Sequence, residues 1–519
     1  MRYSDIVSHT YNTMKPLYTV TEIRAIERAC TATLAPGELM QRAGAAAAAA
    51  ALDLLGSERT GAKVLLLAGP GNNGGDALEV AAHLADAGLQ VTVWQPAGAD
   101  TGAISLERQQ ALARARASAV HFVELTPEAV ASAAVWQLVV DGLVGIGLTR
   151  PLAGPMRHMA ELVNALACPV LALDVPSGLD ADTGAVVGPH GVALRACRTA
   201  TFIGDKVGLH TNDGQDYAGA VQVCGLDLDA TQFAPASAHL NHPRHFARHL
   251  QVRRQNSHKG SYGNVTVLGG ASGMTGAAVL AGRSALLAGA GRVYLAFLDN
   301  APEFDPAHPE LMCRHAADVE LDGSVLVAGP GLGTSHKARD LLLRVFDSAA
   351  PLLLDADALN LVAAQPELQT TLALRGKTTI LTPHPLEAAR LLGISAAAVQ
   401  ADRLAAARQL AAQMNVIVVL KGSGTVVAAP DGAVVVNTSG NPALATAGTG
   451  DVLSGLCGSL LAQGWPEWEA ALAAVWLHGA AADDLVASGA GPIGLSASEL
   501  VPAIRAALNR LVSSNRKRH

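Results

Sequence analysis

A chain of 519 residues exceeds the size that one hydrophobic core usually supports, so we expect two domains of roughly 200–270 residues each. Hydrophobic residues make up 50% of the sequence and charged residues 16%, a balance typical of a chain that is globular throughout. The net charge is −7, and the only basic block is the C-terminal segment NRKRH, so we expect no nucleic acid partner.

The first long apolar stretch, AGAAAAAAALDLL at residues 43–55, is interrupted by Asp53 and is too short to span a bilayer. The N-terminus lacks the basic-then-apolar order of a signal peptide. The six cysteines are scattered without a CxxC pair, which suits reduced thiols and indicates neither a disulfide framework nor a zinc site. We therefore expect a soluble, cytoplasmic protein that is not exported and has no membrane partner.

From residue 63 the sequence alternates between apolar strands and helical patterns. Residues 63–96 predict a strand, a tight loop, a helix and a second strand, and further strands are predicted within residues 136–143, 169–178 and 200–208. This alternation is typical of a parallel, doubly wound α/β sheet, so we expect a Rossmann-like N-terminal domain.

A second series of strands and helices begins near residue 260, starting with a predicted strand, helix and strand within residues 263–297, and it is also of the α/β class. Between the two series, residues 229–257 are rich in Pro, His and Arg and have no strong periodicity. We place the domain boundary in this segment, which predicts domains of residues 1–240 and 241–519.

The loop GPGNNGG at residues 69–75 satisfies the pattern GxGxxG after a strand, so a dehydrogenase is one alternative. That fingerprint also requires an acidic residue near the end of the second strand, and LQVTVWQP ends without one, which disfavours a plain oxidoreductase. The loop instead offers Asn72, Asn73 and Asp76 beside glycines that expose backbone N–H groups.

Three later strands of the first half end in ionisable side chains, namely Asp141, Asp174 and Lys206. Ligands of parallel α/β sheets bind beyond the carboxyl ends of the strands, so we expect these side chains to converge on one crevice. A carboxylate and an amine held together can exchange protons with a substrate, because each shifts the pKa of the other. Each residue taken alone could equally cap a turn at the end of its strand.

The segments GPGNNGGDAL, DGLVGIGLTRPL, DVPSGLDADTG and TFIGDKVGL resemble, in order, the motifs of the NAD(P)H-hydrate epimerase domain, over about residues 18–230. The resemblance implies a potassium ion held by Asn73, Asp141 and Ser177, and a proton-transfer pair of Asp174 and Lys206. It also implies a set of substrate contacts: Asn72, Asn73, Gly74, Gly75, Asp76, Gly145, Ile146, Gly147, Leu148, Thr149, Arg150, Pro151 and Asp174. The usual loop has Asn in place of Pro70 and Gly in place of Ala77, and neither difference removes a side chain from this set.

In the second half, NPALATAGTGDVLSG at residues 441–455 places Asp451 directly after Gly448-Thr449-Gly450, at an expected helix start. Free N–H groups at a helix N-terminus bind anions, and glycines allow a phosphate to approach the backbone closely. A carboxylate at such a site is useful if it faces a hydroxyl that the phosphate chemistry requires. Asp355, Asp357 and Asn360 in DADALN either order water or magnesium or cap a helix.

The combination resembles the ribokinase-like fold, in which the Asp of the Gly-x-Gly-Asp turn activates an acceptor hydroxyl, and Glu387 of HPLE matches a residue that approaches the water shell of the metal. More specifically, HKGSYGNVTVLGG, DADALN, LTPHPLE, LKGSGT and GNPALATAGTGDVLSG resemble the ADP-dependent NAD(P)H-hydrate dehydratase over about residues 250–512. The resemblance implies substrate contacts at Ala277, Gly333, His384 and Asp451. It implies nucleotide contacts at Lys421, Gly422, Ser423, Gly424, Thr425 and Gly450.

The two resemblances together predict an enzyme that repairs hydrated NADH and NADPH. The first domain would interconvert the R and S hydrates, and the second would dehydrate the S hydrate with ADP as phosphoryl donor and Mg²⁺ as metal, giving AMP and phosphate. A homo-oligomer is expected. Two alternatives remain open: a ribokinase-like kinase of a small-molecule hydroxyl, and a first domain that is a non-catalytic binding module.

Overall fold

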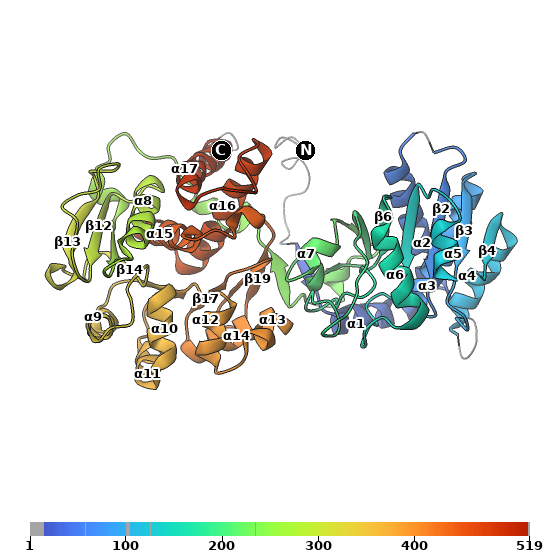
Figure 1. Ribbon diagram of the computed structural model, residues 1–519, viewed down its shortest axis with the longest axis horizontal. Coiled ribbons are helices and arrows are strands. Elements are labelled where there is room, and N and C mark those ends of the chain that lie inside the picture. The colour runs from blue at the N-terminus through green and yellow to red at the C-terminus, as the bar shows by residue number, and fades with distance from the viewer. Residues whose placement is uncertain (1–14, 58, 100–103, 125, 234, 517–519) are drawn as a thin grey trace. The chain divides into compact units, whose positions relative to one another are not determined.

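The computed structural model describes residues 15–516 except residues 58, 100–103, 125 and 234. The first 14 residues and the last three residues of the NRKRH segment lie outside the described residues, so the predictions about a leader and about the basic tail stay predictions. The chain divides into two compact units between Ala238 and His239. We call residues 17–238 the first unit, and the residues from His239 onward the second unit (Figure 1).

The first unit is built on a seven-stranded sheet with the strand order β4-β3-β2-β5-β6-β7-β9, and all neighbouring strands are parallel. This order reverses between β2 and β5, which is the topology of a doubly wound Rossmann-like sheet and confirms the predicted fold class. The strands are β2 (Lys63–Ala68), β3 (Gln90–Trp94), β4 (Val120–Val123), β5 (Leu138–Gly142), β6 (Val170–Leu173), β7 (Arg198–Phe202) and β9 (Ala220–Cys224). A further short parallel pair joins β1 (Pro16–Tyr18) to β8 (Asp205–Lys206).

Helices cover both faces of this sheet because alternate residues of each strand point to opposite sides. Val64 and Leu66 of β2 pack in one cluster with α1 to α4, whereas Leu65 and Leu67 pack in another with α5 and α6. The helices are α1 (Val20–Thr31), α2 (Glu38–Leu55), α3 (Asn72–Asp86), α4 (Leu106–Ala117), α5 (Pro127–Ser132), α6 (Gly154–Ala165) and α7 (Gly214–Tyr217). The alanine-rich stretch of residues 43–55 forms most of α2, and its small side chains allow this helix to pack closely on α3.

The second unit contains a longer sheet in which β13-β12-β11-β14-β15-β16-β17 are parallel neighbours. β18 and β19 continue the sheet in antiparallel order, and β10 lies parallel to β19. The strands are β10 (Ala238–Leu240), β11 (Asn264–Gly269), β12 (Arg292–Phe297), β13 (Met312–His315), β14 (Val325–Ala328), β15 (Leu352–Leu354), β16 (Thr379–Leu381), β17 (Ile417–Leu420), β18 (Thr425–Ala428) and β19 (Val434–Asn437). This sheet with helices on both faces agrees with the predicted ribokinase-like α/β class.

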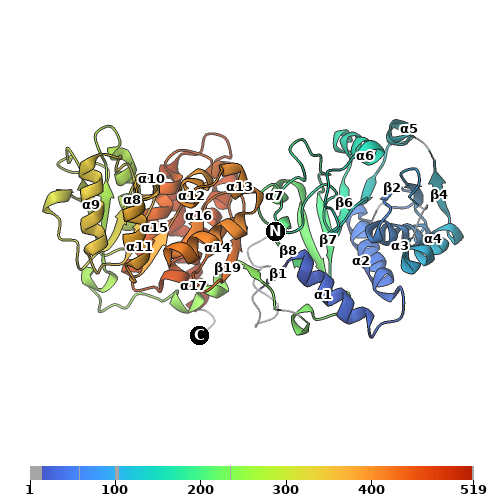
Figure 2. The ribbon, with the colours of Figure 1, turned by 90° about the horizontal axis from the view of Figure 1, so that it is seen from below.

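Figure 1 shows α8, α15, α16 and α17 on one face of the second sheet and α9 to α14 on the other. Figure 2 gives the same helices as seen from below. The helices are α8 (Thr275–Leu287), α9 (His336–Asp347), α10 (Ala356–Ala364), α11 (Pro366–Leu374), α12 (Pro385–Leu392), α13 (Ala396–Ala401), α14 (Arg403–Met414), α15 (Thr449–Ala462), α16 (Glu467–Ala487) and α17 (Ala497–Arg516).

One helix, α16, is long and apolar enough to cross a membrane by length and composition, and it is the only such helix among the described residues. However, 61% of its most apolar window is buried, and residues from Ala470 to Ala482 pack into the core that α8, α15 and α17 share. We therefore interpret α16 as a core helix, whose apolar composition follows from burial on several sides.

Candidate active sites

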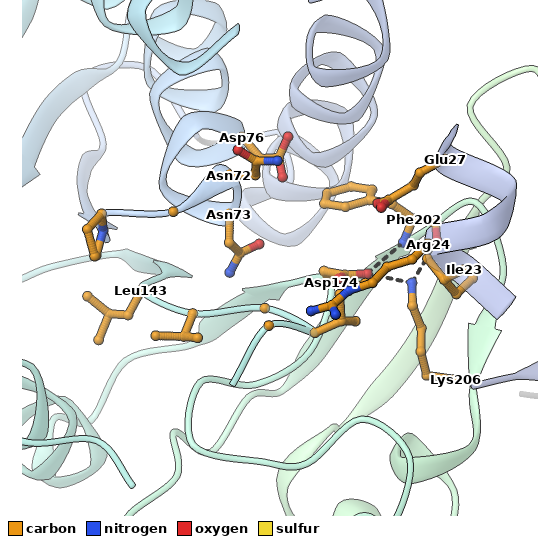
Figure 3. Close-up of a pocket in the computed structure, with 16 residues that line it drawn as sticks. Ile23, Arg24, Glu27, Asn72, Asn73, Asp76, Leu143, Asp174, Phe202 and Lys206 are labelled. Carbon is orange, nitrogen blue, oxygen red and sulfur yellow. Dashed lines mark hydrogen bonds and ion pairs between the residues drawn. The ribbon is translucent and has the colours of Figure 1, made fainter. Parts of the chain in front are cut away.

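The first site is a cavity of about 380 Å³ beside the loops that follow β2 and β5, where the strand order reverses (Figure 3). Ligands of doubly wound sheets bind at this position, and the volume suits part of a nucleotide-sized ligand. The cavity brings together these residues predicted from the sequence: Asn72, Asn73, Asp76, Gly145, Ile146, Gly147, Asp174 and Lys206.

Asp174 and Lys206 form an ion pair in the cavity wall, with 2.5 Å between Oδ1 and Nζ. Asp174 follows β6 with a φ of 64°, a left-handed conformation that is uncommon for residues other than glycine. Its backbone N–H donates a hydrogen bond to the carbonyl of Ala200 at 2.8 Å. The surrounding sheet thus keeps the Asp174 carboxylate in the cavity despite backbone strain, a combination that is frequent at functional sites.

The predicted potassium ligands lie in two neighbouring places. Asp141 is fully buried at the end of β5, and it accepts hydrogen bonds from the Ser177 backbone N–H at 2.8 Å and the Ser177 hydroxyl at 2.6 Å. Burial raises the pKa of Asp141 to about 6, although its hydrogen bonds with Ser177 act against this rise. Asn73 at the start of α3 is 8% exposed, and among the described residues neither its Oδ1 nor its Nδ2 has a hydrogen-bond partner. A buried amide without a partner is costly, so this side chain is suited to bind a ligand.

Other residues of the predicted set do not line the cavity. A Cβ at Gly74 would overlap the carbonyl oxygen of Gly69, so Gly74 allows α3 to begin close to β2. A Cβ at Gly75 would likewise crowd Met40. The segment Leu148 to Pro151 lies outside the residues that line the cavity in this structure.

Helix α1 contributes side chains that the sequence motifs did not include. Ile23, Arg24 and Glu27 line the cavity from the side of α1, as Figure 3 shows for the labelled side chains. These residues lie in an ordinary amphipathic helix whose buried face is Ile23, Ile26 and Cys30. No local pattern distinguishes Glu27 from a solvated helix residue, so sequence reasoning could not have found it.

The second site lies at the N-terminus of α15, which begins at Thr449 after Gly448 with a φ of 89°. Asp451 is in the first turn of this helix, and within the described part of the chain its carboxylate has no hydrogen bond. Burial, followed by the charge of Asp355, raises the pKa of Asp451 to about 7. A carboxylate with this pKa, at a helix end that attracts anions, is suited to act as a base near a phosphate.

Lys421 lies beside this helix end and is held by a buried carboxylate. Its Nζ donates to Asp355 Oδ1 at 2.7 Å, and Ser454 donates to the other Asp355 oxygen at 2.7 Å. Asp355 is 1% exposed, and the Lys421 charge, against the effect of burial, lowers its pKa. A Cβ atom added to Gly450 would lie 3.4 Å from the Lys421 ammonium. The positive charge of Lys421 is therefore close to the glycine turn.

His384 and Glu387 form a capping box at the start of α12. His384 Nδ1 accepts from the backbone N–H groups of Leu386 and Glu387 at 3.1 and 3.3 Å, and Glu387 accepts from the His384 N–H at 2.8 Å. Nδ1 is therefore the acceptor, which leaves Nε2 as the N–H donor of a neutral imidazole. Burial raises the pKa of Glu387 to about 7, and Lys421 Nζ lies 4.0 Å from it.

The residues considered for magnesium are all engaged with the protein. Asp355 holds Lys421 and makes no capping hydrogen bond to α10, Asp357 accepts from the Gly333 N–H at 2.8 Å, and Asn360 accepts from Arg390 at 2.5 Å. The hydrogen bond from Gly333 to Asp357 orders a loop that is predicted to contact substrate. Ala277, another predicted contact, lies close to Gly331 of the same loop. Within the described ranges, no three His, Cys, Asp or Glu side chains are grouped to hold a metal.

The predicted nucleotide loop, residues 421–425, follows β17 and rests on a buried arginine. Arg403 is 1% exposed and donates to the carbonyls of Leu420 and Lys421 at 3.3 and 3.1 Å. Gly422 has a φ of 134° and Gly424 a φ of 60°, so side chains at these positions would be strained. Arg403 and Ser454 are supporting residues that the motifs did not identify, although Ser454 lies inside the quoted segment of residues 441–455.

Two α/β domains, each with a charged cluster at the carboxyl edge of its sheet, define a bifunctional enzyme. Residues 265–505 match the family model described as NAD(P)H-hydrate dehydratase, and residues 36–208 match the model described as YjeF-related protein N-terminus. The chain belongs to the family of bifunctional NAD(P)H-hydrate repair enzymes, as its similarity to full-length relatives shows.

One relative, the bifunctional NAD(P)H-hydrate repair enzyme Nnr of Coxiella burnetii, is 38% identical over 513 residues, which cover 96% of this chain and 100% of the relative. The enzyme of the same name from Escherichia coli K12 is 37% identical, with 91% of this chain and 89% of the relative covered. Among solved structures, the ADP/ATP-dependent NAD(P)H-hydrate dehydratase of Bacillus subtilis, co-crystallised with ATP and Mg²⁺, is 32% identical with a TM-score of 0.47, covering 52% of this chain and 98% of that chain.

Proposed function

We propose that the first unit interconverts the R and S epimers of hydrated NADH and NADPH, and that the second unit dehydrates the S epimer at the expense of ADP. The observation that carries the proposal is that one chain, similar over 96% of its length to a bifunctional repair enzyme, has a charged site in each unit. The kinase and binding-module alternatives account for only one of the two sites.

In the second unit, the proposed reaction begins with the transfer of a phosphoryl group from ADP to the substrate hydroxyl. A hydroxyl is a poor leaving group, whereas a phosphate leaves readily, so the transfer makes the elimination of phosphate feasible and leaves AMP. Asp451 accepts the proton of the hydroxyl, and its pKa of about 7 suits this role at neutral pH. The N–H groups at the start of α15 stabilise the charge of the group in transit.

We infer that Lys421 adds a positive charge at the same place, because its ammonium lies near the Gly450 turn. Of the three N–H groups of Lys421, one donates to Asp355, so others remain available to phosphate oxygens. Asp355 is then a positioning residue, and Ser454 fixes its orientation. Gly422, Ser423, Gly424 and Thr425 would follow the nucleotide, while Ala277, Gly333 and His384 would contact the hydrated ring.

Mg²⁺ fits this site only when it is bound together with the nucleotide. Asp355, Asp357 and Asn360 already have protein partners, whereas the Asp451 carboxylate makes no hydrogen bond to the described residues. Diphosphate oxygens and water commonly provide most magnesium ligands. Bound in this way, the metal would neutralise phosphate charge.

In the first unit, the residues fit a potassium ion. The buried carbonyl oxygen of Asn73 has no hydrogen-bond partner in the described part of the chain, and Asp141 and Ser177 supply further buried oxygens, which are hydrogen-bonded to each other. Oxygen donors of this kind suit a hard cation. When bound, the ion would offset the buried charge of Asp141 and order the wall formed by Gly145, Ile146 and Gly147.

Two further points remain predictions of the proposal: a cytoplasmic location, with which the six free cysteines agree, and a homo-oligomeric assembly. The experiment that tests the function is incubation of the purified full chain with hydrated NADPH, with and without ADP. Absorbance of restored NADPH should appear only with ADP, and it should account for both epimers. Accumulation of a phosphorylated product in place of NADPH would support a kinase instead.

A further inference from the structure

The proton-transfer groups proposed so far for the first unit include a base but no acid. The three N–H groups of the Lys206 ammonium are all taken, by Asp174 Oδ1 at 2.5 Å, Thr201 Oγ1 at 2.9 Å and the Phe202 carbonyl at 2.7 Å. The Lys206 side chain also has no exposed surface. Asp174 is an ion-paired carboxylate, which accepts hydrogen bonds and donates none. Lys206 therefore supports Asp174 and has no proton free for a substrate.

Epimerisation by loss and return of the hydroxyl requires an acid as well as a base, because the hydroxyl is a poor leaving group until it is protonated. Glu27 of α1 is a suitable candidate, since it lines the same cavity as Asp174 and Asp76 (Figure 3). Within the part of the chain that the structure describes, its carboxyl group makes no hydrogen bond or ion pair. The side chain is half-buried and lines the cavity.

The position of Glu27 is fixed by the way α1 is attached. Thr19 and Glu22 form a capping box at the start of the helix, and the Val20 N–H donates to Asp182 Oδ1 at 2.6 Å. Tyr18, just before the helix, pairs with Lys206 across β1 and β8. Glu27 is thus held on the same framework as the Asp174–Lys206 pair, which is the rigidity that a catalytic group requires.

Burial of Glu27 favours its protonated form, because it raises the pKa of this carboxyl. The charge of Asp174 raises this pKa further, and the charges of Lys206 and of the arginines of α1 lower it. The titratable and charged groups that face Glu27 from each neighbouring element are Arg24, Arg28 and Cys30 of α1, Asp76 of α3, Asp174 after β6 and Lys206 of β8. A protonated carboxylic acid donates a hydrogen bond, which Asp174 cannot do.

We propose that Glu27 is a further catalytic residue of the first unit, acting as the general acid that protonates the hydroxyl of the hydrated nicotinamide while Asp174 serves as the base. This inference rests on the proposed function of the first unit. It goes beyond the motifs because Glu27 precedes the matched residues 36–208.

Glu27 gives its proton to the hydroxyl oxygen, the C–O bond breaks with its electron pair on oxygen, and water leaves while the lone pair of the neighbouring ring nitrogen forms a C=N bond. Water then adds to the other face of the carbon, and the C=N electron pair returns to nitrogen. The proton lost by the added water passes to Asp174. Exchange with solvent restores the proton of Glu27 and removes that of Asp174.

The test uses the full chain without ADP, so that dehydration by the second unit is silent, and the purified R epimer of hydrated NADPH. Chromatography follows the appearance of the S epimer from pH 5 to pH 9, in ordinary water and in water labelled with oxygen-18. The wild-type rate should fall as the pH rises through the pKa of Glu27, and the product should carry the label. Glu27→Gln should lower kcat by about 100-fold or more and abolish this alkaline fall. Glu27→Asp should keep part of the rate together with the fall.

The matched control is Glu107→Gln on α4, a glutamate that does not line the cavity. ADP-dependent dehydration of the S epimer and the thermal melting curve check that each variant is folded. The inference is overturned if Glu27→Gln keeps more than a tenth of the wild-type rate, or if the alkaline fall survives in Glu27→Gln and disappears in Asp76→Asn. Absence of the oxygen label would overturn the hydroxyl-loss step. If the wild-type chain fails to interconvert the epimers at all, the proposed function itself is wrong.

Discussion

Replacement of Asp451 by asparagine separates the chemistry of the second unit from its folding and from nucleotide binding. Asp451→Asn keeps the size of the side chain and removes its ability to accept a proton. Loss of a general base typically costs 10²–10⁴-fold in rate, so we expect the kcat of ADP-dependent dehydration to fall by about 100-fold or more. ADP binding should be retained, because the backbone N–H groups at the start of α15 are unchanged.

The pKa of about 7 sets the expected pH dependence. Only the ionised carboxylate accepts a proton, so the wild-type kcat should rise with pH and level off above pH 8. At pH 6, about one unit below the pKa, roughly a tenth of the Asp451 side chains are ionised, and kcat should be about a tenth of its plateau. The residual rate of Asp451→Asn should lack this rise.

The same pKa predicts an effect on stability in the opposite direction. A carboxyl group whose pKa is raised on folding destabilises the folded protein above that pKa, and the effect disappears below the unfolded value of 3.8. A rise of about three units corresponds to at most about 4 kcal/mol, so Asp451→Asn should increase the free energy of unfolding at pH 8 and change it little at pH 4.

The assay combines three measurements on the full chain: absorbance of restored NADPH at saturating hydrate and ADP, calorimetric titration with ADP, and urea unfolding at pH 4 and pH 8. Asp340→Asn, on the exposed side of α9, is the matched control. The role of Asp451 as base is refuted if the variant keeps more than a tenth of the wild-type kcat, or if the wild-type kcat is flat between pH 6 and pH 8.

Three other outcomes are expected. Replacing potassium with a bulky organic cation should slow epimerisation and leave dehydration unchanged, and Asp141→Ala should have the same effect; indifference to both changes would remove the cation from the mechanism. Asp355→Asn should lower the stability of the second unit by about 3 kcal/mol in urea unfolding, because it leaves the Lys421 ammonium without its buried partner, and an unchanged midpoint would contradict this. Residues 245–519 alone should give a biphasic progress curve on mixed epimers, and residues 1–240 added in trans should make conversion complete; rapid consumption of both epimers by residues 245–519 would remove the need for an epimerase.

Much of the fold was predictable because apolar strands and intervening helices have a strong local signal. Residues 63–96 were predicted as strand, loop, helix and strand, and they form β2, the loop, α3 and β3. The convergence of Asp174 and Lys206 on one cavity was also predictable, because the carboxyl ends of parallel strands meet at one edge of a sheet. Asp141, which was expected to join them, is instead fully buried at the end of β5 and does not line the cavity. The switch in strand order between β2 and β5 placed these ends beside each other.

The sequence could not predict which polar side chains already use all their hydrogen-bonding groups within the protein. The resemblance implied a proton-transfer pair of Asp174 and Lys206, and only the structure shows that Asp174, Thr201 and Phe202 accept from all three N–H groups of Lys206. The same limit applies to Asp355, whose partner Lys421 is 66 residues away in the chain. A motif shows which polar groups are present, but the contacts within the folded protein decide which of these groups remain available to a substrate.

The sequence by itself therefore determined the two α/β units, the family and most of the residues at the two sites, because these follow from periodicity and from short motifs. Only the tertiary structure brought Glu27 from α1 into the first cavity and left its carboxyl group without a hydrogen bond to any described residue. It also placed Asp451, partly buried, near the charge of Asp355, and these surroundings raise the pKa of Asp451 to about 7. Desolvation and the distance between charges are properties of the assembled fold, since residues far apart in the chain supply the low-polarity surroundings and the neighbouring charges.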